Sequence, residues 1–82
     1  MDGDKKGQTP PHNLEAEASL LGAILIDSDA LVKIADVVRP DDFFDARHKH
    51  IFEAILTLYE RRSPIDVLTL ADQLKTAGML DM

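Results

Sequence analysis

The sequence contains no cysteine and no tryptophan. Without cysteine, its 82 residues form neither a disulfide framework nor a zinc site built on thiolates, so packing alone has to hold the fold. Aromatic residues are few, with three Phe and one Tyr, and the core therefore has to consist mainly of aliphatic side chains and alanine. Such a core is typical of small helical bundles, and no alternating polar and apolar run indicates a strand. We expect an all-α domain.

Long hydrophobic segments are also missing. The longest apolar run, residues 20–26, is far too short to span a bilayer, and the polar N-terminal stretch has no apolar segment of the kind found in a secretory signal. We expect a soluble protein of the cytoplasm that has no contact with a membrane.

Positive charge is in deficit, because nine Lys and Arg face fifteen Asp and Glu for a net charge of −6. This balance works against the release of counterions that drives non-specific DNA binding, so we expect no direct nucleic-acid binding. The densest basic patch consists of Arg47, Lys49, Arg61 and Arg62, and acidic residues alternate with it, as on a solvated helix face. Acidic residues such as Asp36 and Asp66 could equally meet a basic partner, and the sequence leaves this choice open.

Two parts are expected along the chain, a flexible N-terminal lead at residues 1–11 and a helical domain at residues 12–82. The lead is rich in Gly, Pro and charge, and its residues 3–9 do not fit the spacing of a Walker phosphate loop. Asn13 can cap a helix over residues 14–26, and a second helix is expected over about residues 29–38, after a cap from Asp27 and Ser28. Pro40 ends it.

The second half of the domain predicts a single helical turn at residues 41–44, whose two phenylalanine rings fill the core, and two further helices. Asp45 can cap the third helix, which ends at Arg61 and Arg62, and Asp66 or Thr69 opens the fourth. Gly78 closes the fourth helix in the left-handed conformation. The prediction is therefore four main helices plus a short helical turn, and a close helix crossing is expected at Gly22, inside the first helix.

The apolar positions of these helices recur at helical spacing and define the expected core. We expect each truncation of an inward side chain there to leave a destabilising cavity. The predicted core residues are Leu21, Leu25, Ile34, Phe43, Ile51, Phe52, Ile55, Leu70 and Leu74.

The sequence has few residues that could form a catalytic or metal site. A cluster of possible metal ligands comprises Asp41, Asp42, Asp45, His48 and His50. The two histidines, however, lie about 200° apart on a helix, so a capping role for Asp45 is favoured over a metal site. His50 is interpreted as a hydrogen-bonded packing residue. No nucleophile, base and oxyanion donors occur together, and we expect no catalytic, cofactor or metal site in this chain, with the partner-binding residues undetermined.

Four sequence motifs, in this order and at these spacings, carry a family resemblance. They are Pro11-His-Asn-Leu-Glu-Ala-Glu-Ala-Ser-Leu-Leu-Gly-Ala-Ile-Leu-Ile26, Asp41-Asp-Phe-Phe44, His50-Ile-Phe-Glu-Ala-Ile55 and Pro64-Ile-Asp-Val-Leu-Thr-Leu70. In this order they resemble the opening domain of the DnaB-type replicative helicases. The sequence has Ala18 where the family often has Gln and Phe44 where it often has Tyr, and both are mild changes.

The resemblance implies a collar domain of a homohexameric, ATP-driven helicase that unwinds DNA at the replication fork and docks primase. ATP and Mg²⁺ are expected in a motor domain, which, like the helical hairpin of the collar, would follow residue 82. A lone chain is expected to be a monomer or weak dimer, because it is acidic and no exposed apolar stripe is expected to remain. The alternative is a stand-alone helical adaptor or regulator that shares the fold.

Overall fold

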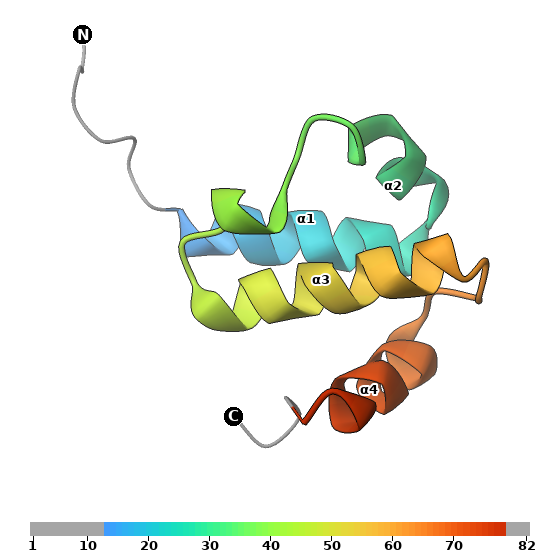
Figure 1. Cartoon of the computed structure of the whole chain (residues 1–82). Coiled ribbons are helices and arrows are strands. Elements are labelled where there is room, and N and C mark those ends of the chain that lie inside the picture. Colours follow the sequence, from blue (N-terminus) through green and yellow to red (C-terminus); the bar gives the residue numbers. More distant parts are fainter. Residues whose placement is uncertain (1–12, 79–82) are drawn as a thin grey trace, which may run out of the picture.

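The computed structural model describes residues 13–78, which form four α-helices and one 3-10 turn (Figure 1). The elements are α1 (Leu14–Ile26), α2 (Asp29–Ile34), η1 (Pro40–Asp42), α3 (Ala46–Glu60) and α4 (Val67–Thr76). No strand occurs among these residues, so the expected all-α fold is confirmed. The predicted flexible lead at residues 1–11 and the final residues 79–82 lie outside the described part. No described helix is both long and apolar enough to cross a membrane.

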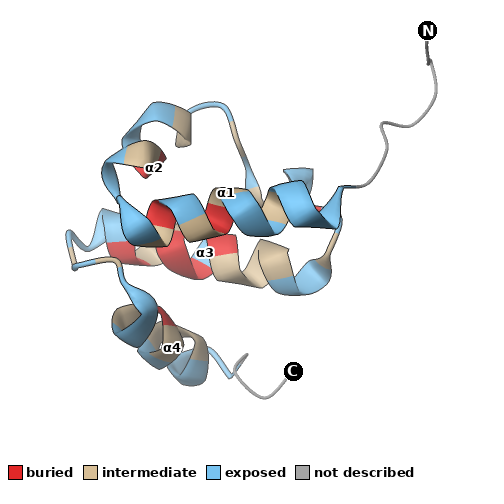
Figure 2. Cartoon of the chain, turned by 180° about the vertical axis from the view of Figure 1, so that it is seen from behind, coloured by how far each residue is buried: buried red, intermediate tan, exposed pale blue. Residues whose placement is uncertain are grey.

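Helices α1 and α3 lie side by side and run in the same direction (Figures 1 and 2). Two parallel helices need a connection that returns to the starting end, and residues 27–45, with α2 and η1, make that return. Helix α2 packs against α1, η1 packs against α3, and α4 packs mainly against α3. Helix α3 is therefore the element on which most of the domain is assembled.

The helix starts lie where the capping residues predict them. The Asn13 side chain accepts the N–H of the residue three positions later at 2.9 Å, and Asp45 accepts that of Arg47 at 2.7 Å. Asp66 and Thr69 form a reciprocal capping box, in which each side chain accepts the other's backbone N–H at 2.9 Å. At the other end of α4, Gly78 has φ +77°, as predicted. Local chemistry therefore sets these helix boundaries.

Helix α2 is shorter than predicted. It ends at Ile34, whose carbonyl accepts the N–H groups of both Val37 and Val38 at 2.9 Å. A shared acceptor of this kind is common at helix termini, where the chain leaves the regular spiral. Arg39 is fully extended (φ −118°, ψ 156°), because the ring of Pro40 disfavours the helical conformation of the residue before it. The cap also differs in part, because the Asp27 side chain supplies it and that of Ser28 does not.

The core lies between α1, α2, η1 and α3, with α4 covering one side (Figure 2). Among residues 13–78, four side chains are completely buried, those of Ile24, Leu31, Phe52 and Ile55. The Phe43 ring, which is 7% exposed, packs on Phe52 with ring centroids 5.1 Å apart. Among the predicted core residues, the structure buries Leu21, Phe43, Phe52, Ile55 and Leu70, and it places Leu25, Ile34, Ile51 and Leu74 half-buried against them.

Three details of packing were predicted wrongly. Phe44 is 60% exposed and does not fill the core with Phe43, because the two side chains of an extended segment point in opposite directions. No helix crosses closely at Gly22, since an added Cβ there would meet nothing within 4 Å. Apolar side chains also remain exposed, contrary to expectation. They include Ile26, Val37, Val67 and Leu68.

Candidate functional site

A carboxylate on α1 holds the start of α3. One oxygen of Glu17, Oε2, accepts the N–H of Phe44 at 2.6 Å. The other, Oε1, accepts the N–H of Asp45 at 3.3 Å and lies 2.8 Å from Nδ1 of His48. The Glu17 and His48 side chains are only 15% and 17% exposed. Because an ionised carboxylate only accepts, Nδ1 of His48 has to carry the proton of this contact. We call these four residues the Glu17 cluster.

The cluster favours negative charge on its carboxylates. The hydrogen bond from the Phe44 N–H, then that from His48, lowers the pKa of Glu17 below its ordinary 4.5. The neighbouring Asp45 has its pKa lowered to about 2, first by the hydrogen bond from the Arg47 side chain and then by the Arg47 N–H. Hydrogen bonds to the charged form stabilise it, so both groups stay ionised at a lower pH than they otherwise would.

The sequence analysis did not find the role of Glu17. A signal was present, because Glu17 shares the spacing of the buried residues Leu21 and Ile24 on one helix face. An acidic residue at an apolar position needs a polar partner from another element, and here the segment between η1 and α3 and the first turn of α3 provide it. The partner itself lies 27–31 residues away in the chain, a separation that local patterns do not reveal.

The possible metal ligands are not brought together. His48 turns toward Glu17, whereas Nδ1 of His50 lies 3.3 Å from Oε1 of Glu53, one turn further along α3. Asp41 forms an ion pair with Lys49 at 2.8 Å, which lowers the pKa of the aspartate. Within residues 13–78 no group of three His, Cys, Asp or Glu could hold a metal ion.

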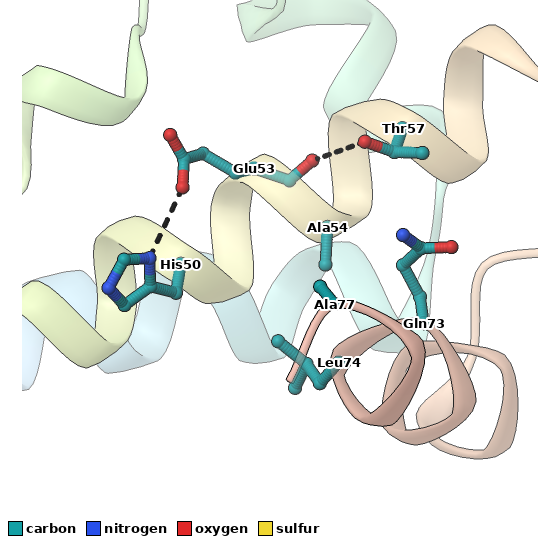
Figure 3. A pocket seen from close by; sticks show the side chains of 7 residues that line it. All are labelled: His50, Glu53, Ala54, Thr57, Gln73, Leu74 and Ala77. Atoms are coloured by element: carbon teal, nitrogen blue, oxygen red, sulfur yellow. Dashed lines mark hydrogen bonds and ion pairs between the residues drawn. The ribbon is translucent and has the colours of Figure 1, made fainter. Parts of the chain in front are cut away.

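A small cavity of about 100 Å³ lies between α3 and α4 (Figure 3). His50 and Glu53 stand at one end of it, and Ala54, Leu74 and Ala77 supply apolar surface. The remaining polar groups already have partners. The Thr57 hydroxyl donates to the Glu53 carbonyl at 3.0 Å, and Gln73 accepts from Arg61 at 3.3 Å. The cavity therefore offers no activated nucleophile.

A larger, apolar groove lies on the opposite side of the core, between α1 and the η1 segment. It encloses about 250 Å³. Its apolar lining is formed by Ala16, Leu20, Val38 and Phe43, and the carboxylates of Glu17 and Asp42 complete it. We call this hollow the α1–η1 groove. A groove of apolar side chains with acidic groups at its edge suits contact with another protein better than with the anionic backbone of DNA.

These features define a small all-helical domain that offers surfaces and a groove. Residues 9–82 match the family model described as "DnaB-like helicase N terminal domain", and the chain belongs to that family.

Full-length relatives are similar over most of this chain. A protein of Leifsonia xyli described as "Replicative DNA helicase DnaB" is 41% identical over 85 residues, which cover 96% of this chain and 19% of the relative. One of the same description from Rhodothermus marinus is 37% identical, covering 92% of this chain and 8% of the relative. The chain thus spans a fifth or less of these two relatives' length.

A solved structure supports the same grouping. The crystal structure of the N-terminal domain of DnaB helicase from Mycobacterium tuberculosis superposes with a TM-score of 0.84 at 40% sequence identity. The match covers 89% of this chain and 51% of the solved one. The helical arrangement described above is therefore that of the DnaB N-terminal domain.

Proposed function

We propose that this chain is the collar and protein-interaction domain of a replicative helicase that forms a homohexameric ring and unwinds DNA at the replication fork. The observation that carries the proposal is the match to the solved DnaB N-terminal domain, at a TM-score of 0.84 over 89% of the chain. The exposed apolar residues and the α1–η1 groove give such a domain surfaces for partners.

The proposed partners are primase and the other subunits of the ring, in the cytoplasm. ATP and Mg²⁺ would be held by a separate motor domain of the helicase. Several carboxylates of the described residues are engaged in helix caps and in contacts between helices. Examples are Glu17, Asp45 and Asp66.

The test of this proposal is binding to primase from the same source. The labelled chain is titrated with primase, and a relative domain from a replicative helicase of the family serves as the positive control. We expect both this chain and the control domain to bind primase. A lone domain should bind with lower affinity than an assembled collar, because it buries a smaller interface. If the control binds and this chain does not bind at high micromolar concentration, the proposal of primase docking is wrong.

The expected state of the isolated chain is a monomer or weak dimer. The net charge of −6 makes identical copies repel, while exposed apolar residues such as Ile26 and Leu68 favour weak association. Sedimentation velocity at high micromolar concentration measures the balance. A stable hexamer would show that these residues alone carry the ring contacts.

A further inference from the structure

We propose that the α1–η1 groove docks a large apolar side chain from a helical partner segment that also carries lysine or arginine. The inference rests on the proposed function, because it gives the interaction domain a specific contact site. The groove has the space for it, about 250 Å³, between Leu20 of α1 and Val38 and Phe43 of the returning segment.

The charge around the groove selects the partner. The residues of its lining and neighbouring segments include the acidic Glu15, Glu17, Asp36, Asp41, Asp42 and Asp45. The same segments contain the cations Arg39, Arg47 and Lys49. Two of these already form ion pairs, Lys49 with Asp41 at 2.8 Å and Arg47 with Asp45 at 2.9 Å. Asp42 accepts only a backbone N–H, that of Arg39, among the described contacts. The edge of the groove is therefore net negative.

An apolar groove with a net negative edge matches an amphipathic helix that carries cations next to its apolar anchor. Two other hollows among the described residues fit this occupant less well. The cavity between α3 and α4 has a volume of only about 100 Å³, and the hollow beside Tyr59 and Pro64, at about 260 Å³, has the cation of Arg62 to balance the single carboxylate of Asp29. Residues 1–12 of this chain do not match the occupant either, because their sequence contains no large apolar side chain apart from Met1.

The test uses a synthetic peptide of roughly 18 residues, long enough to be helical in water, with Leu on one face and Lys on the other. It is titrated into the ¹⁵N-labelled chain, and the amide shifts are followed by NMR. The largest shifts are expected at Leu20, Val38 and Phe43. A second peptide with Glu in place of Lys is expected to bind at least about tenfold more weakly, because it meets like charge.

Two matched variants on α1 locate the site. Ala16→Trp places a ring in the groove, and Ala18→Trp places the same ring about 200° around α1, away from the groove. Both alanines are exposed, so both variants retain the fold. Ala16→Trp should weaken peptide binding about tenfold or more, and Ala18→Trp should leave it unchanged.

Equal loss in the two variants, equal binding of the Glu peptide, or shifts centred on another face would each overturn the inference. These outcomes are separate from the test of the proposed function. One outcome is that primase binds both the chain and the Ala16→Trp variant equally well, while the peptide does not bind the groove. In that case only the docking inference fails. If the peptide enters the groove and primase does not bind the chain, the inference stands and primase docking is wrong.

Discussion

The central region and α4 are held in different ways. The central region comprises α1, α2, η1 and α3, and all four completely buried side chains of the described residues lie in it. Helix α4 packs mainly on one helix, α3, and its only buried residue is Leu70. Val67 and Leu68, at the start of α4, are 67% and 81% exposed.

Polar contacts follow the same division. The central region is tied by Glu17, which reaches a segment far along the chain, whereas α4 depends on its local capping box of Asp66 and Thr69. One side-chain bond, from Arg61 to Gln73, joins α3 to α4 at 3.3 Å. Segments with few buried contacts open more easily than the core, so α4 should be the first helix to unfold locally.

The largest effect is expected from Phe52→Ala, in the central region. Phe52 is completely buried against Phe43, and its truncation should lower the free energy of unfolding by about 3–5 kcal/mol. For a domain of this size, that approaches its total stability. Chemical denaturation with circular dichroism measures the change. A loss below about 1 kcal/mol would show that Phe52 is not at the centre of the core.

A smaller and more local effect is expected from Leu70→Ala in α4. The side chain is 7% exposed at the contact with α3, so its loss should cost about 2–3 kcal/mol, at the low end for leucine, because the site lies at the edge of the core. Hydrogen exchange should speed up in α4 more than in α1. Equal acceleration in both helices would show that the two regions unfold as one unit.

The contrast also explains what the sequence could predict. The ends of α1 and α4 follow from local groups, Asn13, Asp66 and Gly78, and the structure shows those caps. Helical spacing likewise identifies α3, on which Phe52 and Ile55 are completely buried. Chemistry within one helical turn is therefore readable from the sequence.

Features that form where segments distant in the sequence meet were not predicted. Ile24 of α1 and Leu31 of α2 are completely buried and were left out of the predicted core. For Ile24, the nearly uniform apolar surface of α1 does not reveal which face meets α3. Ala54 and Leu58 are also buried, and Ala54 lines the cavity between α3 and α4. The α1–η1 groove belongs to the same class, since it requires residues 16–20 to meet residues 38–43.

Acid should weaken the contacts that Glu17 and Asp45 make in the central region. The folded pKa values of Glu17 and Asp45 are lowered, so the stability they contribute is complete above the unfolded values of 4.5 and 3.8. It is lost as the pH falls through the folded values, about 2 for Asp45. Melting temperatures should therefore hold above about pH 5 and decline from there to pH 2.

Glu17→Gln tests the origin of this decline. The amide keeps one acceptor oxygen but loses the charge, so the melting temperature at neutral pH should fall by less than in Leu70→Ala, and the decline below pH 5 should flatten. Glu15→Gln, an exposed change on the same turn of α1, is the control and should leave the acid profile unchanged. Identical profiles for the two variants would contradict the role of the Glu17 cluster.

Removing the cap of α4 should have a modest effect. Asp66→Ala breaks the capping box with Thr69 and should cost about 1 kcal/mol. Asp66→Asn, which retains a capping oxygen, should recover most of it. Exchange of the first amides of α4 reports the change directly, and an unchanged rate in Asp66→Ala would mean that packing on α3 alone fixes the start of the helix.

The smallest effect has the opposite sign. Gly22 lies inside α1, and an added Cβ would meet nothing within 4 Å, so Gly22→Ala should stabilise the helix by about 0.5–1 kcal/mol through reduced backbone freedom. The melting temperature should rise by a few degrees. A fall would mean that another surface lies close over this glycine in solution, and the dependence on protein concentration would show whether that surface belongs to a second copy of the chain. The melting temperature of the unsubstituted protein would then rise with protein concentration, whereas that of Gly22→Ala would not.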